Sequence, residues 1–232
     1  MKTRELLKKL EDYPLFTEND LSKMLKKPPE YIRTLACRLK KQNLIFRIEK
    51  GKYSVYSDPL AFSTFISVPS YASLWTALRF YDFTEQLPKD IFVMVPISKK
   101  EIKFNKVKIV FVKTKHFWGY NKERYGSFYI FMADKEKAVV DSLLSNKIPV
   151  DEIAKAIESK ELDVDKLVDY AVRVNSSALS KRLGFLLEHF NLECGSLLKM
   201  VDYNYIPLDS MLKAVGNKSK KWKIIINRRE FL

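Results

Sequence analysis

Residues 29–42, PEYIRTLACRLKKQ, interleave aliphatic and basic side chains at the spacing of an α-helix. At about 100° per residue, the aliphatic side chains fall on one stripe, formed by Ile32, Leu35, Ala36 and Leu39. The opposite side is polar and basic, and it carries Tyr31, Thr34, Arg38 and Lys41. We therefore expect one face to enter a hydrophobic core, while the basic face meets either water or a partner.

A second helix is expected just before this one, separated from it by a short break. In LFTENDLSKMLKK, residues 15–27, Thr17 is placed to cap a helix whose first turn is acidic. Pro29 then stands at a first helical position, where the missing N–H costs nothing. Residues 3–11, TRELLKKLE, predict an earlier helix through three leucines. The pattern indicates three helices, the last two joined by a tight turn.

Two short β-prone runs follow in NLIFRIEKGKYSVYS, residues 43–57, joined across Glu49, Lys50 and Gly51. Three helices followed by a two-stranded hairpin is the order of a winged helix-turn-helix, a module that binds DNA. The residues expected to contact DNA are Tyr31, Arg33, Thr34, Arg38, Lys41, Arg47, Lys50 and Lys52. A winged helix that only docks another protein is the alternative, and basic residues on both the helix and the hairpin make it less attractive.

Positive charge is concentrated in three segments of the chain. The net charge is +14, and residues 1–56 supply half of it, with fourteen Lys and Arg against seven Asp and Glu. Two further basic blocks lie at 98–124, with nine basic against two acidic residues, and at 213–229, with seven against none. Basic patches on an otherwise acidic chain favour a polyanion as the partner. Charge alone does not separate DNA, RNA and a ribosomal surface.

The rest of the chain alternates helical and extended patterns. Ser70 is expected to cap a helix that runs to Tyr81, and Asp134 to cap another. Strands are expected at 91–95, 106–114, 127–133 and 222–227, and helices at 135–144, 152–159, 165–174 and 176–190. The strand at 106–114 is apolar on both faces, so we expect it to be buried on both sides.

The fold class expected is α+β. A winged helix-turn-helix at residues 1–58 would be followed by a larger mixed α/β domain at 59–232, with a small sheet and a helical C-terminal part. No apolar run approaches the roughly eighteen residues that cross a bilayer, and the charged N-terminus does not resemble a secretory signal. We expect a cytoplasmic protein with no membrane partner. Two distant cysteines and two histidines predict neither a disulfide framework nor a metal site, and no cofactor is expected.

Five blocks of the chain, in order, resemble the AbiEi-type antitoxins, predicted transcriptional regulators of viral defence operons. The first block is the N-terminal module. The others are SYASLWTALRFYDFTEQLP at 70–88, KTKHFWGYNKERYGSFYIFMADKEKAVVDSLL at 113–144, SALSKRLGFLLEHF at 177–190 and WKIIIN at 222–227. Relatives often carry Gly after the aromatic pair of the 70–88 block, where this chain has Asp82.

The resemblance implies a repressor with two roles in a type IV toxin–antitoxin operon. The winged helix would bind double-stranded operator DNA at inverted repeats before its own operon and repress transcription. The larger domain would counter a toxin of the nucleotidyltransferase type, without a stable complex between the two proteins. These functions are implied by the resemblance, whereas composition and spacing support only the binding of a polyanion.

The sequence carries no recognisable catalytic motif, so we do not expect an enzyme. A nucleotidyltransferase needs a Gly-Ser turn followed some ten residues later by two metal-binding aspartates one residue apart. After the Gly-Ser pair at 195–196, Asp202 comes too soon and Asn204 stands in place of the second carboxylate. Asp163 and Asp165 have the right mutual spacing, but they precede the Gly-Ser pair, and helix capping explains them better.

Two alternative functions remain open. The first is an enzyme that transfers a phosphoryl group from a nucleotide to a partner toxin. Its nucleotide would be surrounded by four charged residues from the blocks that carry the resemblance, Lys137, Asp141, Lys181 and Arg182. Salt bridges between neighbouring helices are the simpler explanation for them. The second alternative is RNA or tRNA binding by the basic blocks of the larger domain, with bases stacked on His116, Phe117, Trp118 and Tyr120 beside Lys113, Lys115, Lys122 and Arg124. Burial of these aromatic rings in the sheet competes with this alternative.

Overall fold

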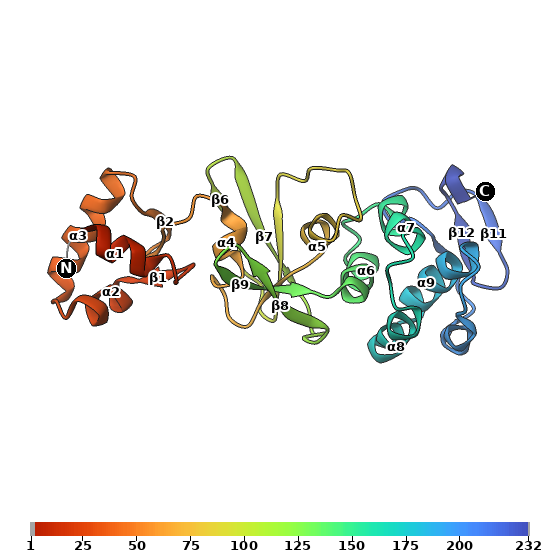
Figure 1. Ribbon diagram of the computed structural model, residues 1–232. Helices are drawn as coiled ribbons and strands as arrows, with labels where there is room; N and C mark the ends of the chain where they lie inside the picture. The colour runs from red at the N-terminus through yellow and green to blue at the C-terminus, as the bar shows by residue number, and fades with distance from the viewer. Residues whose placement is uncertain (1–2, 232) are drawn as a thin grey trace. The chain divides into compact units, whose positions relative to one another are not determined.

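The N-terminal module folds as three helices and a small antiparallel sheet (Figure 1). Its elements are α1 (Thr3–Leu10), β1 (Phe16–Thr17), α2 (Glu18–Leu25), α3 (Pro29–Lys41), β2 (Phe46–Glu49) and β3 (Lys52–Ser54). The strands are ordered β1-β3-β2, so the hairpin β2–β3 gains a third strand from the segment before α2. This computed structural model describes residues 3–231. The predicted helices and hairpin are confirmed, whereas β1 was not expected from the sequence.

Local signals set the boundaries of α2 and α3 as the sequence predicts. The Thr17 side chain accepts a hydrogen bond from the Asp20 backbone N–H at 3.1 Å, and the Asp20 carboxylate accepts from the Thr17 N–H at 2.8 Å. This capping box satisfies N–H groups that the first helical turn leaves without partners. The α2 helix ends at Leu25 and is capped by Lys26, which adopts the left-handed conformation, and Pro29 begins α3. The turn between the two helices is therefore short.

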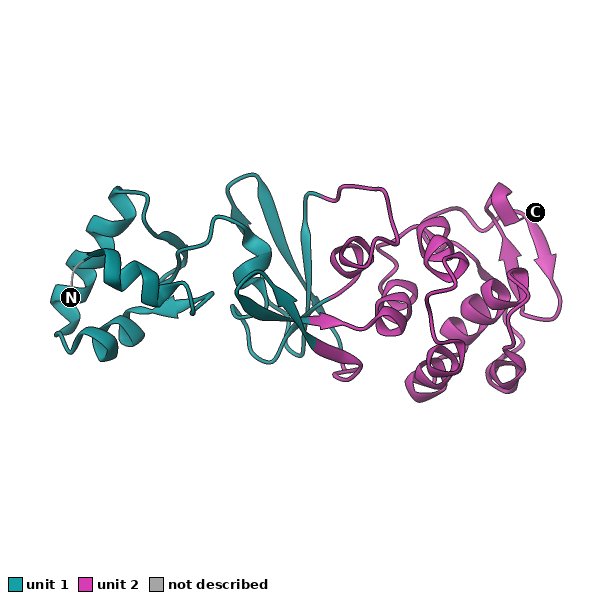
Figure 2. Ribbon diagram, viewed as in Figure 1, with its two compact units in different colours: residues 1–72, 89–114, 122–131 teal, residues 73–88, 115–121, 132–232 magenta. Residues whose placement is uncertain are grey.

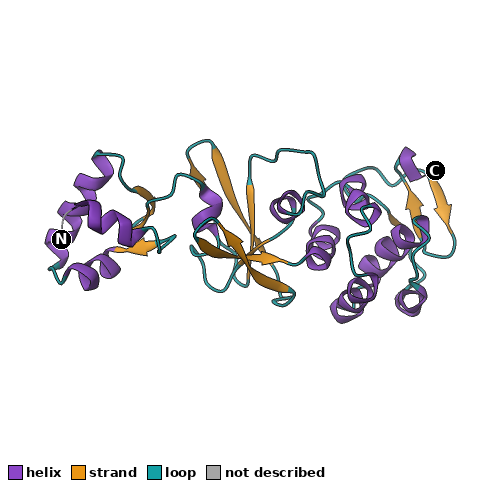
Figure 3. Ribbon diagram, viewed as in Figure 1, coloured by secondary structure: helices purple, strands orange, loops and turns teal. Residues whose placement is uncertain are grey.

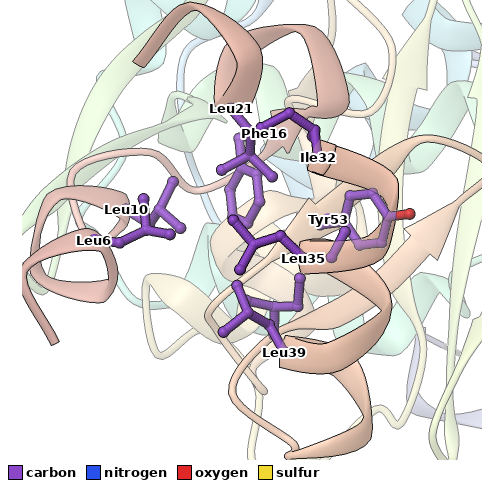
Figure 4. Close-up of a cluster of buried hydrophobic side chains, with 10 residues drawn as sticks. Leu6, Leu10, Phe16, Leu21, Ile32, Leu35, Leu39 and Tyr53 are labelled. Carbon is purple, nitrogen blue, oxygen red and sulfur yellow. The ribbon is translucent and has the colours of Figure 1, made fainter. Parts of the chain in front are cut away.

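The apolar stripe of α3 enters the core of the N-terminal module, as its spacing predicts. Figure 4 shows side chains from the three helices and from β1 and β3 facing one another in this core. Its buried members are Leu6, Leu10, Phe16, Leu21, Ile32, Leu35, Ala36, Leu39, Ile45 and Tyr53. Burying this stripe fixes the rotation of α3, so the polar side of the helix faces solvent.

A six-stranded mixed sheet follows the N-terminal module (Figure 3). Its strands are β4 (Tyr71–Ala72), β5 (Ile91–Val95), β6 (Ile102–Phe104), β7 (Val107–Lys113), β8 (Tyr120–Tyr125) and β9 (Phe128–Ala133). The order across the sheet is β6-β7-β5-β4-β9-β8, and the neighbouring strands β7 and β5 are parallel. The short helix α4 (Pro59–Ser63) packs its Phe62 ring edge-on against Phe104, with 5.1 Å between ring centroids.

Two sequence predictions for this region are wrong. Ser70 does not cap a helix: residues 71–72 form β4, which pairs with β5, and α5 begins only at Trp75 and ends at Phe80. The Ser70 hydroxyl instead donates to the Thr64 carbonyl at 2.7 Å. Pairing with a buried strand outweighs the local helical pattern here. In β7, one face is buried, but Val110 and Val112 on the other face are only half-buried.

The C-terminal part consists of four helices of the described chain and a small three-stranded sheet. The helices are α6 (Lys135–Ser145), α7 (Val150–Glu158), α8 (Val164–Val174) and α9 (Ser177–His189), followed by the 3₁₀ turn η1 (Gly195–Met200). The sheet contains β10 (Ile206–Pro207), β11 (Asn217–Ser219) and β12 (Ile224–Ile226), and the turn η2 (Arg229–Phe231) comes after it. Asp134 and Asp163 cap α6 and α8, which confirms both expectations.

A close approach fixes β12 against α9. A Cβ atom at Gly184 of α9 would lie 2.1 Å from Cζ3 of the buried Trp222, far inside van der Waals contact. Glycine therefore allows the indole to lie directly on the helix backbone. The indole N–H of Trp222 also donates to the Glu188 carboxylate, one turn further along the same helix. These contacts explain why the 222–227 segment, predicted as a terminal strand, is held at this place.

The chain divides into two compact units that interleave in sequence (Figure 2). Unit 1 comprises residues 3–72, 89–114 and 122–131 of the described chain, and unit 2 comprises 73–88, 115–121 and 132–231. The predicted domains at 1–58 and 59–232 stay a prediction, and their outermost residues, 1–2 and 232, lie outside the described part. Among residues 3–231, no helix has the length and apolarity that crossing a membrane requires.

Candidate nucleic-acid interface

The outward side of α3 carries a continuous basic surface, which we call the α3 face. It lines a shallow depression and is formed by Arg33, Thr34, Cys37, Arg38 and Lys41. All five residues are exposed. They recur at three- and four-residue intervals, so the helix places their side chains on one side. Sequence reasoning identified four of them and missed Cys37, although its spacing from Thr34 and Lys41 predicts the same face.

The contacts of the α3 face leave its charges largely available. The Arg33 Nε atom lies 3.7 Å from a Glu18 carboxylate oxygen, and the Arg33 side chain is 69% exposed. An exposed ion pair of this kind contributes less than about 1 kcal/mol, so a phosphate can replace the carboxylate at small cost. Thr34 Oγ1 donates to the Glu30 carbonyl at 3.1 Å and remains at the surface.

Tyr31 stands at the edge of the α3 face. Its side chain is 48% exposed, and the Lys27 ammonium lies 5.9 Å from the centre of its ring. Together with Arg38, both residues line a second, smaller hollow that extends to Thr3 on α1. The structure therefore brings all the predicted contact residues of α3 to one side of the N-terminal module.

The hairpin supplies fewer free cations than the sequence suggests. Arg47 is exposed and its Nε atom donates to the Glu49 carbonyl at 3.3 Å, while Lys50 is exposed in the turn. Lys52 is half-buried: its Nζ atom donates to the Ile66 carbonyl at 2.7 Å and lies 3.3 Å from the Glu49 carboxylate. The Lys52 charge is thus used within unit 1. Of the three cations expected on the hairpin, Arg47 and Lys50 are exposed and Lys52 is not.

The inner side of the hairpin packs on the rest of unit 1. Ile48 is buried in a core cluster that includes Phe62, and the Phe46 ring contacts Phe104 edge-on at 5.7 Å. Glu49 accepts a hydrogen bond from Lys99 at 2.7 Å. Burial favours a higher pKa for the Glu49 carboxyl, but the hydrogen bonds and charges of Lys99 and Lys52 outweigh it and lower the pKa. The hairpin is consequently anchored, with its outer edge left to solvent.

The four residues considered for a nucleotide site have other partners. Lys137 and Asp141 form a buried ion pair within α6, exposed by 0% and 1% respectively. Lys181 pairs with Asp202 at 2.6 Å, and Arg182 donates from Nε to the Pro207 carbonyl at 3.2 Å. These contacts hold parts of unit 2 together. Both lysines are buried, so neither ammonium group is presented at the surface.

The aromatic segment 116–120 is half-buried against helices of unit 2. Trp118 lies 4.7 Å from the Tyr170 ring, and the Arg173 guanidinium lies 4.5 Å from the Trp118 ring centre. The Lys137 ammonium approaches the same indole at 4.9 Å. The Trp118 ring is therefore engaged with side chains of α6 and α8. An unpaired base would have to displace them in order to stack on Trp118.

Comparisons with known proteins support the architecture and nothing more specific. No protein-family model matches the sequence, and no curated protein matches it. The crystal structure of the RV2827C protein from Mycobacterium tuberculosis has a similar fold, with a TM-score of 0.66 and 11% sequence identity. The alignment covers 94% of this chain and 89% of that chain. At this identity, the likeness extends to the fold alone.

Proposed function

We propose that this chain is a DNA-binding transcriptional repressor whose N-terminal module is a winged helix-turn-helix. The observation that carries the proposal is the α3 face, which presents exposed basic residues along one side of a helix whose other side is buried. Such a helix fits the major groove of duplex DNA, and basic side chains at its margins meet the phosphates. A concentration of positive charge on one face favours a polyanion as the partner.

The element order supports the same proposal. A winged helix-turn-helix has two helices joined by a tight turn, followed by a hairpin that reaches the neighbouring backbone. Here α2, α3 and the hairpin β2–β3 follow in that order, and β1 closes the small sheet. In this proposal α3 is the recognition helix. Arg47 and Lys50 on the hairpin contact the phosphate backbone or the minor groove, whereas Lys52 contributes little because it is bonded to Ile66.

Salt dependence tests the proposal directly. If the α3 face and the exposed cations of the hairpin neutralise four or five phosphates, the logarithmic salt slope is about −4. Affinity for duplex DNA from the region upstream of the gene is then expected to fall roughly two to three decades between about 50 and 200 mM salt. Fluorescence anisotropy with a labelled duplex measures this slope. A module that docks proteins would bind the duplex weakly at both salt concentrations, with no comparable loss.

The biological role that we propose rests on the sequence resemblance to the AbiEi-type antitoxins. The repressor would bind inverted repeats in its own operator, in the cytoplasm, as the antitoxin of a toxin–antitoxin operon in antiviral defence. A nucleotidyltransferase toxin encoded beside it would be the functional partner. A promoter–reporter fusion tests the first half of this role, and co-expression with the neighbouring gene tests the second. If the protein represses the reporter but does not rescue cells from the toxin, the repressor function is supported and the antitoxin role is rejected.

A further inference from the structure

The C-terminal sheet presents one basic, aromatic face to solvent. The parallel pairing of Ile206 with Ile224 sets Tyr205 beside Lys223, and the antiparallel pairing of Lys218 with Ile225 brings Lys218 to the same face. This follows because side chains alternate between the two faces of a sheet and paired residues share a face. The other face contains the buried Ile224, which packs toward α9.

Two ammonium groups converge on a single ring at this face. The Nζ atoms of Lys218 and Lys223 lie 5.2 and 5.4 Å from the ring centre of Tyr205. Within residues 3–231, neither lysine has a carboxylate partner within 4.0 Å. A ring offsets part of the repulsion between two cations, but an anion placed beside them stabilises them far more. The arrangement is therefore complementary to a negative group.

Two other basic residues of the same block are neutralised by acidic side chains. Lys221 lies 2.9 Å from the Glu188 carboxylate, and Arg228 lies 2.8 Å from Asp209 and 3.1 Å from Asp151. The chain thus supplies carboxylates to the neighbours of the sheet face but not to the face itself. The charges of Lys221 and Arg228 are therefore offset within the protein, whereas those of Lys218 and Lys223 are shared only with the Tyr205 ring.

Exposed residues next in sequence to those of the face provide a tyrosine ring and further charge. Tyr203 is 93% exposed, two residues before Tyr205, and Lys213 and Lys220 are exposed on the segments that flank β11. A ring so exposed contributes almost nothing to the core, whereas unpaired bases gain from stacking on it. We call the surface formed by Tyr203, Tyr205, Lys218, Lys220 and Lys223 the C-terminal basic face.

We propose that the C-terminal basic face binds single-stranded nucleic acid. Lys218, Lys220 and Lys223 contact successive phosphates, and an unpaired base stacks on Tyr203. Bases in a duplex are already stacked and do not offer their faces to such a ring, so an exposed tyrosine favours a single strand. An acidic peptide would satisfy the lysines but not the tyrosine. The inference stands apart from the proposed repressor function, because it rests on different residues.

The test uses the full-length chain carrying R33E, R38E and K41E, which removes the charge of the α3 face. Anisotropy is measured with labelled oligo(U) and oligo(dT) of equal length, so that the two arms distinguish RNA from DNA. We expect this background to bind single strands measurably. Adding K218E and K223E is expected to weaken binding at least about tenfold, and adding Y203A about tenfold.

Matched variants control for net charge and for loss of a surface ring. K147E with K160E changes the charge of unit 2 by the same amount at other exposed positions, and Y129A removes another exposed tyrosine, which is 58% exposed. Circular dichroism verifies that each variant is folded. The proposal is overturned if the variants of the C-terminal basic face bind single strands as tightly as the background, or if the controls lose as much. A loss confined to duplex DNA would also overturn it.

Discussion

Replacing Arg33, Arg38 and Lys41 together by glutamate is expected to reduce affinity for the upstream duplex by at least about a hundredfold. The three side chains lie on the α3 face and are exposed, so the substitutions leave the core untouched. Each reversal removes a phosphate contact and adds repulsion from the negatively charged backbone. The salt slope is expected to flatten by about three, one for each lost contact. Anisotropy titrations at two salt concentrations measure both effects.

A control variant separates the effect of net charge on DNA affinity from the effect of where the charges lie. The control variant reverses Lys89, Lys147 and Lys160, which are exposed outside the N-terminal module and change the net charge equally. We expect it to bind the duplex within a few-fold of the unmodified chain, since only long-range attraction is weakened. Equal losses in the two variants would mean that α3 makes no special contact and that the chain binds DNA through its overall charge.

Replacing Asp141 by alanine is expected to destabilise the protein by about 3–5 kcal/mol. The Asp141 carboxylate pairs with the Lys137 ammonium and accepts a hydrogen bond from the Ser73 hydroxyl at 2.8 Å, and all three side chains are buried. Without the carboxylate, a charge and a hydroxyl are left in the interior with one partner fewer. Chemical denaturation followed by circular dichroism measures the loss. The double substitution of Lys137 by methionine and Asp141 by leucine is expected to recover most of it.

The defect of the Asp141 variant is expected to shrink as the pH rises. Burial lowers the pKa of Lys137, and the charge and hydrogen bond of Asp141 partly oppose that effect. Removing Asp141 therefore lowers the pKa further, so the folded variant binds fewer protons than the unfolded chain, whose lysine titrates near 10.4. Stability then increases with pH up to the unfolded pKa. A defect of equal size at pH 7 and at pH 9 would show that Lys137 stays charged without Asp141, contrary to this account.

Local sequence patterns predict the helices correctly where the signals that define a helix lie within the helix itself. The buried stripe of α3, the capping box at Thr17 and the caps at Asp134 and Asp163 follow from spacing and from side chains that bond within a few residues. The prediction of a helix after Ser70 was wrong because the structure of this segment depends on pairing with β5, some twenty residues away. Strands as short as β1, β4 and β10 carry no periodicity of their own, and only pairing defines them.

The same division between local and distant contacts applies to the candidate site. Periodicity predicts the exposed residues of α3, because a single buried stripe determines which side of the helix faces solvent. It does not predict that Lys52 bonds to the Ile66 carbonyl, fourteen residues away, or that Glu49 is held by Lys99. The sequence therefore overestimates the number of cations that the hairpin offers. Cys37 lies at the helical spacing of the same face but was not among the predicted contact residues.

The two cysteines provide the most direct test of the proposed DNA contact. Cys37 is exposed at the centre of the α3 face, and Cys194 is buried in unit 2, so a thiol-specific reagent distinguishes them without any substitution. We predict that saturating upstream duplex slows the alkylation of Cys37 in proportion to the fraction of protein bound, while slow labelling of Cys194 is unchanged. If Cys37 reacts at the same rate in the fully bound protein, the α3 face does not contact DNA and the central claim is contradicted.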